Sequence, residues 1–148
     1  MREKLSEDKE IKHLDTIYES RVKFNEADPL GIVWHGNYIA YFEEGREFFG
    51  RTHGISYLDI HEHGFSTPIV KSTCNHLKPL KYAEVFTVKT SLVYTPAAKM
   101  IFNYYIYNSS DELVCYGQTI QAFVDNSGNL SLYCPDFYTL WKDKNNFK

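Results

Sequence analysis

The most regular hydrophobic pattern in the chain is helical and runs from Asn37 to His53. Apolar or small residues recur there at steps of three and four, which places them on one face of a helix: Tyr38, Tyr41, Phe42, Gly45, Phe48, Phe49 and Thr52. We expect Asn37 to cap the N-terminus and Gly54 to end the helix. Because glycine inside a helix costs about 1 kcal/mol relative to alanine, Gly45 indicates that the helix backbone approaches a sheet closely.

The remaining segments alternate between apolar and polar residues, as strands do. A first strand is predicted around residues 16–24, and a short helical turn at 57–63. Further strands are predicted at residues 67–77, 84–95, 99–108 and 113–125, with a short one at 130–133 after a hairpin turn. One face of the last long strand is expected to carry Val114, Tyr116, Ile120, Ala122 and Val124, although Gln118 interrupts it. Residues 135–142 predict a closing helical turn that packs back through Phe137, Leu140 and Trp141.

This order of elements favours an α+β fold. The strands after the long helix are joined by short turns, which predicts an antiparallel meander. One face of such a sheet needs a cover, and the single apolar helix is available for it. We therefore expect the hotdog fold, a curved antiparallel sheet of five or six strands wrapped around one long central helix. No linker or repeat interrupts it, so residues 1–148 form one domain, with 1–13 as a mobile or peripheral lead-in and 134–148 as a C-terminal extension.

Composition narrows the possible functions. A chain of 148 residues is long enough to bury a sizeable core. Its 12 Tyr and 10 Phe favour sheet structure. The formal net charge of -3 disfavours nucleic acid as a partner. No apolar run approaches the length of a membrane span and the N-terminal residues are charged, so we expect no stable membrane insertion and a cytoplasmic location.

The cysteines and histidines predict no metal site. Cys74, Cys115 and Cys134 are odd in number, far apart in the sequence and without a CxxC pair, which argues against a disulfide framework or a cysteine zinc site. His61 and His63 are two residues apart and would lie on opposite sides of a helix. The other histidines, His76 among them, have no carboxylate or cysteine partner at a spacing typical of metal ligands.

The loop before the long helix carries the most specific pattern. Residues 28–38 read Asp-Pro-Leu-Gly-Ile-Val-Trp-His-Gly-Asn-Tyr, and residues 41–46 read Tyr-Phe-Glu-Glu-Gly-Arg. This segment resembles the opening of the 4-hydroxybenzoyl-CoA thioesterase family of hotdog acyl-CoA thioesterases, and a weaker similarity extends over about residues 16–125. Two departures stand out. Many relatives have Asp-Thr-Asp where this chain has Glu26-Ala27-Asp28, and Glu-Glu-Ala-Arg where it has Gly45 before Arg46.

The resemblance implies hydrolysis of a small or medium acyl-CoA to the free acid and coenzyme A, without a metal or redox cofactor. Asp28 would act as nucleophile or general base, and the backbone N–H at His35 would hold the thioester oxygen. A helix N-terminus suits that role because its N–H groups are unpaired and carry partial positive charge. Five residues are expected to contact the substrate: Gly31, Trp34, Gly36, Asn37 and Tyr38. Glu44 is a reserve catalytic candidate, because some relatives place a catalytic glutamate on this helix.

Each of these residues also has a purely structural interpretation. Asp28 precedes Pro29 and would suit the start of a turn. The His35 side chain would suit a local backbone hydrogen bond, and Glu44 would suit a solvated helix face. Arg46 is expected to pair with Glu43 on the helix surface. Lysines are expected to bind the coenzyme A phosphates or else to remain solvated; Lys99 is the first candidate, followed by Lys71, Lys78 and Lys81.

Two further functions share this fold. Hydroxyacyl dehydratases carry a catalytic histidine in a Pro/Gly-rich motif that this sequence lacks. A non-catalytic acyl-CoA-binding or scaffolding protein stays open, because the loop has lost the hydroxyl beside Asp28. The exposed edge of a single sheet predicts a homodimer or homotetramer, and the resemblance implies two sites per dimer, each at the subunit interface.

Overall fold

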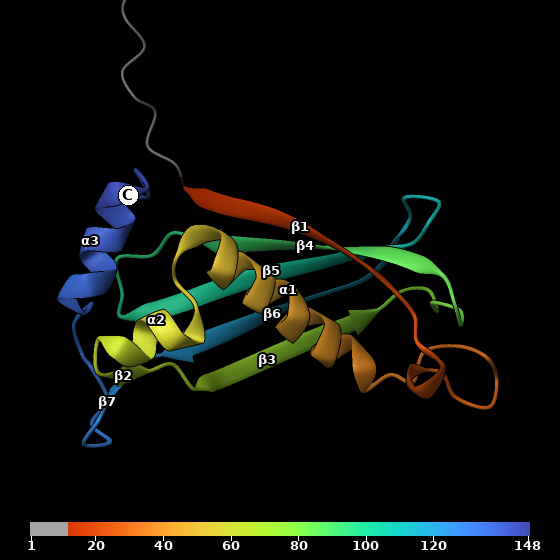
Figure 1. The fold of residues 1–148 in the computed structure, drawn as a ribbon, viewed down its shortest axis with the longest axis horizontal. Coiled ribbons are helices and arrows are strands. Elements are labelled where there is room, and N and C mark those ends of the chain that lie inside the picture. Colours follow the sequence, from red (N-terminus) through yellow and green to blue (C-terminus); the bar gives the residue numbers. More distant parts are fainter. Residues whose placement is uncertain (1–11) are drawn as a thin grey trace, which may run out of the picture.

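A five-stranded antiparallel sheet curves around one long helix in the computed structural model, which describes residues 12–148 (Figure 1). The sheet strands are β1 (His13–Arg21), β3 (Ile69–His76), β4 (Val85–Val93), β5 (Lys99–Tyr107) and β6 (Leu113–Ala122). Two short strands, β2 (Phe65–Ser66) and β7 (Val124–Asp125), pair separately. The helices are the 3-10 turn η1 (Phe24–Glu26), α1 (Asn37–His53), α2 (Tyr57–Glu62) and α3 (Asp136–Lys144). The predicted α+β hotdog architecture is confirmed.

The order of the sheet is β1-β4-β5-β6-β3. The predicted meander is correct for β4, β5 and β6, which are neighbours in space as in sequence. It is wrong for β3, which lies beyond β6 at the far edge and pairs with no other strand. The chain between β3 and β4 therefore passes from one edge of the sheet to the other side of β5, and β3 is left with one free edge.

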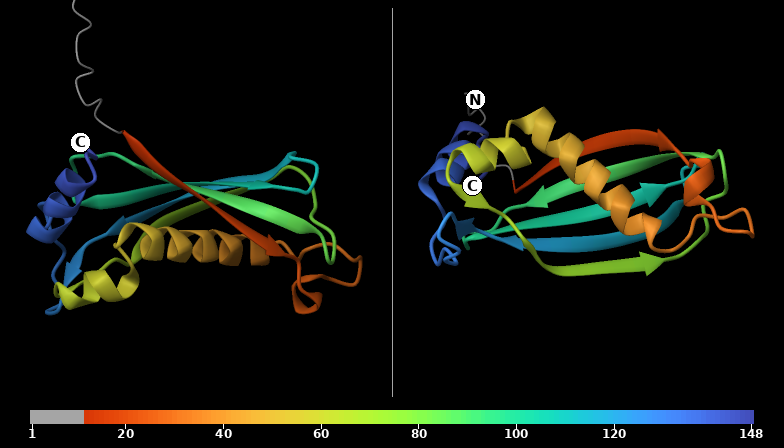
Figure 2. Two further views of the ribbon diagram at one scale, coloured as in Figure 1. Left: turned by 45° about the horizontal axis from the view of Figure 1, so that its top comes forward. Right: turned by 60° about the horizontal axis from the view of Figure 1, so that its bottom comes forward.

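Helix α1 lies along the concave side of the sheet, as Figure 2 shows. Its bounds agree with the hydrophobic pattern, and Gly54 ends it in the left-handed conformation with φ of 69°. The close approach at Gly45 is confirmed, since a Cβ there would lie 2.5 Å from Thr90 Oγ1 and 2.8 Å from Val88 Cγ1. The expected cap at Asn37 is wrong. Gly36 occupies the N-cap, and the Asn37 side chain donates instead to the carbonyl of Glu26 at 2.8 Å.

The inward face of β6 differs from the predicted one. Gly117 lies against the Phe42 ring, and Thr119 shares a 2.6 Å hydrogen bond with Tyr104 inside the core. Of the residues predicted to share one face, Val114 and Ala122 are buried, whereas Tyr116 is 40% exposed. Polar residues such as Thr119 can face the core because buried hydrogen bonds satisfy them. An apolar pattern alone therefore does not identify the inward face of β6.

The two ends of the chain also differ from expectation. β1 begins at His13, inside the predicted lead-in, and residues 1–11 of that lead-in lie outside the described residues. In α3, Trp141 packs back as predicted and donates to the His53 carbonyl at 2.7 Å, but Leu140 is 68% exposed. Residues 130–133 form no strand; Leu130 makes an isolated bridge with Val124, and Ser131 donates to the Phe123 carbonyl at 2.8 Å.

Substitution of Gly45 by alanine tests the close approach. Helix propensity alone predicts a gain of about 1 kcal/mol in the free energy of unfolding. The contacts at Val88 and Thr90 predict the opposite sign, because the added methyl group overpacks the interface and costs about 1–3 kcal/mol. Urea unfolding measures the difference, and a more stable Gly45→Ala variant would contradict the observed packing.

Candidate active site

The loop of residues 22–36 joins β1 to α1 at the end of the sheet opposite α3 (Figure 1). Backbone hydrogen bonds hold it along its length. Val33 donates to the Leu80 carbonyl at 2.9 Å, and Tyr82 donates to the Gly31 carbonyl at 3.0 Å. The loop also closes on itself, since Trp34 donates to the Glu26 carbonyl at 3.0 Å. These bonds fix the loop against the chain between β3 and β4.

Asp28 starts a tight turn in this loop. Its Oδ1 accepts the Leu30 N–H at 2.8 Å, and its carbonyl accepts the Gly31 N–H at 2.9 Å. Gly31 has φ of 78°, a conformation that glycine adopts without strain. Within residues 12–148, Asp28 Oδ2 accepts no hydrogen bond. Asp28 therefore starts a turn, as its structural interpretation predicts. The turn uses only one of its two carboxylate oxygens, so the other can still contact a ligand.

Two backbone N–H groups lack a hydrogen-bond partner, within residues 12–148, where the loop enters α1. Within the described residues, the N–H groups of His35 and Gly36 donate no hydrogen bond, whereas Asn37 N–H donates to the Trp34 carbonyl at 2.9 Å. The 17 residues of α1 add the positive end of a helix dipole at the same place. His35 is seven residues after Asp28, and its side chain is exposed. The same loop therefore carries a carboxylate and, seven residues later, N–H groups without a hydrogen bond within residues 12–148.

The aromatic residues of the motif have different environments. The Trp34 ring covers Gly36 so closely that a Cβ at position 36 would lie 2.1 Å from it, and the ring is 53% exposed. The Tyr38 side chain is buried, and its hydroxyl accepts the Leu80 N–H at 3.1 Å. Burial raises the pKa of that hydroxyl. Trp34 can therefore contact a ligand, while Tyr38 holds the start of α1 against the chain after β3.

Glu44 and Arg46 lie partly inside the protein. Burial raises the pKa of the Glu44 carboxyl above its usual range; Lys23 opposes that shift, and Glu26 reinforces it. Arg46 points inward and donates to the Tyr104 hydroxyl at 3.1 Å. The predicted surface pair between Arg46 and Glu43 is wrong, because the buried hydroxyl offers the guanidinium a better-shielded partner.

Lys99 lies at the opposite end of the sheet from the loop of residues 22–36. Arg21, at the loop end of the sheet, pairs with Val85, whereas Lys99 lies beyond the pairing of Val93 with Ile101. The length of β4 separates these ends by roughly 25 Å. Lys81 is the predicted lysine nearest to the loop, since it forms a β-bridge with Ile32.

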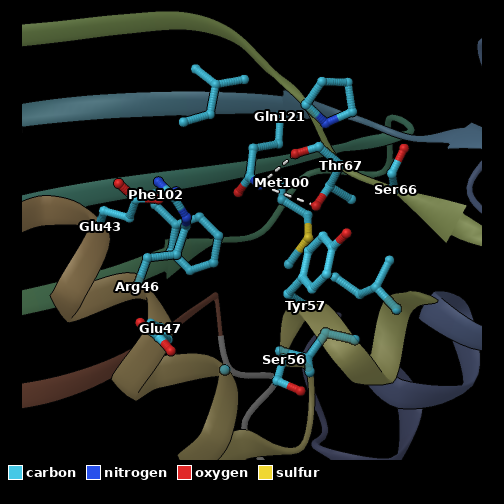
Figure 3. Close-up of a pocket in the computed structure, with 15 residues that line it drawn as sticks. Glu43, Arg46, Glu47, Ser56, Tyr57, Ser66, Thr67, Met100, Phe102 and Gln121 are labelled. Atoms are coloured by element: carbon cyan, nitrogen blue, oxygen red, sulfur yellow. Dashed lines mark hydrogen bonds between the residues drawn. The ribbon is translucent and has the colours of Figure 1, made fainter. Parts of the chain in front are cut away.

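A cavity of about 520 Å³ opens farther along α1, between that helix, α2 and strands β5 and β6 (Figure 3). Met100 and Phe102 supply apolar wall, and Gln121 donates through Nε2 to the Thr67 carbonyl at 2.7 Å. Glu43, the lining residue of α1 nearest its start, is seven residues past Gly36, or about 10 Å along the helix axis. The sequence prediction missed this cavity.

Three potential metal ligands meet elsewhere, at the free edge of the sheet. The ligand atoms of Cys74, His76 and Cys115 all lie within 4.8 Å of one another, and the two sulfurs are 3.4 Å apart. Cys74 and Cys115, far apart in the sequence, are therefore close in space, and the expectation that His76 has no cysteine partner is wrong. Pairing of β3 with β6 joins residues about 40 positions apart, which spacing along the sequence cannot reveal.

No helix within residues 12–148 is both long and apolar enough to cross a membrane.

Comparison with known proteins gives one consistent family. Residues 22–141 match the Thioesterase-like superfamily. The Bacillus subtilis protein named "Putative acyl-CoA thioesterase YneP" is 30% identical over 128 residues, covering 84% of this chain and 93% of that protein. The structure of DHNA-CoA thioesterase from Staphylococcus aureus has a TM-score of 0.77 at 26% identity, covering 88% of this chain and 91% of that one. A 4-hydroxybenzoyl CoA thioesterase mutant, complexed with 4-hydroxybenzoyl CoA, shares the fold with a TM-score of 0.74 at 21% identity, over 86% of this chain and 97% of that one.

Proposed function

Since this chain belongs to the thioesterase-like superfamily, we propose that it is an acyl-CoA thioester hydrolase that converts a small or medium acyl-CoA to the free acid and coenzyme A. The observation that carries the proposal is the pair of N–H groups at His35 and Gly36, which donate no hydrogen bond within residues 12–148 and lie on the same loop as the Asp28 turn. Hydrolysis of a thioester builds negative charge on the carbonyl oxygen. Preorganised donors aimed at such an oxygen are commonly the largest catalytic contribution.

Asp28 supplies the second requirement of the reaction. Its free Oδ2 attacks the thioester carbon, or it takes the proton of an attacking water. In both versions the N–H of His35 stabilises the oxyanion, and coenzyme A leaves as the thiolate, which takes a proton from solvent. In the nucleophilic version, water then hydrolyses the acyl–Asp28 anhydride, which releases the free acid and restores the carboxylate. The reaction needs no metal or redox cofactor, because coenzyme A is part of the substrate.

The proposal also includes an apolar acyl group, bound in the cavity beside α1, and a cytoplasmic location. The cavity beside α1 has a volume of about 520 Å³, within the range of small-molecule sites. Its walls of Met100, Phe102 and Ile60 suit an apolar acyl group. The three free cysteines are consistent with the reducing cytoplasm.

The Asp28→Asn variant is expected to lower turnover by about 10²–10⁴-fold without loss of folding. Asparagine can accept the same Leu30 N–H, so the turn stays intact while the charge and basicity are lost. Thiol release from a panel of short-chain, aromatic and longer-chain acyl-CoA substrates measures the effect. Asp125→Asn is the matched control, because Asp125 also accepts a backbone N–H two residues ahead, at 2.9 Å.

Turnover within a few-fold of wild type in Asp28→Asn would remove Asp28 from the mechanism. Wild-type protein that binds acyl-CoA but releases no thiol from any member of the panel would favour the non-catalytic binding protein instead.

Replacement of His35 separates its backbone from its side chain. His35→Pro deletes the N–H, and because that N–H makes no hydrogen bond within residues 12–148, the fold should survive. The expected loss of transition-state stabilisation is about 3–4 kcal/mol. His35→Ala keeps the N–H and should lower turnover less than Asp28→Asn. Circular dichroism and melting temperature are recorded beside the kinetics.

Two outcomes would contradict this assignment. Near-normal turnover in folded His35→Pro would place the oxyanion donor elsewhere. An equal loss of turnover in His35→Ala and His35→Pro would show that the imidazole side chain, and not the backbone N–H, contributes to catalysis.

A homodimer or homotetramer is expected in solution. Within residues 12–148, strand β3 pairs only with β6, and it exposes Ile69 and Val70, which are 45% and 62% accessible. A free edge with apolar side chains is commonly covered by a second copy. Light scattering at micromolar concentration should give at least twice 17.3 kDa. A fully active monomer would contradict both the pairing and sites shared between subunits.

A further inference from the structure

The free edge of the sheet brings three metal-binding side chains to one face. Cys74 and His76 are two residues apart on β3, so their side chains leave the strand on the same side. On β6, Cys115 lies directly opposite His76 in the register, and Gly117 lies opposite Cys74. The sulfurs of Cys74 and Cys115 lie 3.4 Å apart.

The donor atoms in this cluster are not committed to other partners. The two thiols contact each other and form no disulfide. Within residues 12–148, no hydrogen bond or ion pair involves the His76 ring; it packs edge-on against Tyr38 at a centroid distance of 5.1 Å. Accessibility rises from buried Cys115 through half-buried Cys74 to exposed His76. An ion can therefore enter from the solvent side of His76.

We propose that Cys74, His76 and Cys115 bind one Zn²⁺ ion, with water in the fourth position. Two cysteines and one histidine are ligands that zinc prefers, at about 2.3 Å for sulfur and 2.0–2.1 Å for nitrogen. Tetrahedral geometry with those bonds requires sulfurs about 3.8 Å apart, slightly more than the 3.4 Å observed. Small side-chain rotations supply the difference. Each thiol releases its proton to solvent as its Zn–S bond forms.

The bound ion would join the edge strand β3 to β6. It would also orient the His76 ring beside Tyr38, whose hydroxyl holds the chain after β3 at the start of α1. This site stands apart from the proposed reaction, in which zinc has no part. The two ideas therefore fail independently.

Metal titration of the reduced full-length chain tests the site. With a phosphine reductant present, Co²⁺ should give a thiolate charge-transfer band and the strong visible bands of a tetrahedral ion, and Zn²⁺ should abolish both. Calorimetry should show one Zn²⁺ per chain, and Zn²⁺ should raise the melting temperature. Cys74→Ser and His76→Gln should each weaken Zn²⁺ binding by about 10- to 100-fold or more. Cys134→Ser is the matched control, because Cys134 lies outside the cluster, and its affinity should be unchanged.

Three results would overturn the proposal. The first is the absence of thiolate–cobalt absorption in folded wild-type protein. The second is Zn²⁺ binding that persists unchanged in Cys74→Ser, which would assign the ion to other surface groups. The third is equal loss of binding in Cys134→Ser. If the buried Cys115→Ser fails to fold, Cys74→Ser and His76→Gln still decide the matter, because their side chains are more exposed.

Discussion

The close contact between α1 and the sheet determines the geometry of the whole molecule. At Gly45 the helix backbone lies directly over Val88 and Thr90, and at Gly117 the sheet leaves room for the Phe42 ring. Each partner thus lacks a side chain where the other approaches. Interiors packed at this density leave little freedom to slide or rotate. The first turn of α1 is therefore held in one place and in one direction, and the donors at that turn are fixed with it.

The loop before α1 depends on the same anchor. Asn37, in the first turn, donates to the Glu26 carbonyl and so ties the helix to the loop that carries Asp28. The turn at Asp28 uses one carboxylate oxygen for structure and leaves the other free. The structural and catalytic interpretations of this aspartate are therefore compatible, because the bond to Leu30 N–H aims the carboxylate while its second oxygen stays available.

Local patterns in the sequence were sufficient for the helix and its end at Gly54, because these depend on neighbours within a few positions. Local patterns failed where contacts between residues far apart in the sequence determine the strand order or the direction of a side chain. Thr119 and Gln121 face inward on β6 because distant partners satisfy them. The place of β3 at the sheet edge, and with it the meeting of Cys74 and Cys115, follows from a strand order that no local pattern encodes. The motif located the Asp28 loop, but the free N–H groups required the structure.

The most direct test of the account is the structure of the protein with a hydrolysis-resistant acyl-CoA analogue that keeps the carbonyl group. The account predicts that the carbonyl oxygen lies about 2.7–3.1 Å from the backbone nitrogen of His35 or Gly36. It also predicts the Asp28 carboxylate on the same side as the carbonyl carbon, directly or through one water. A bound analogue whose carbonyl contacts neither nitrogen, with Asp28 facing solvent, would contradict it.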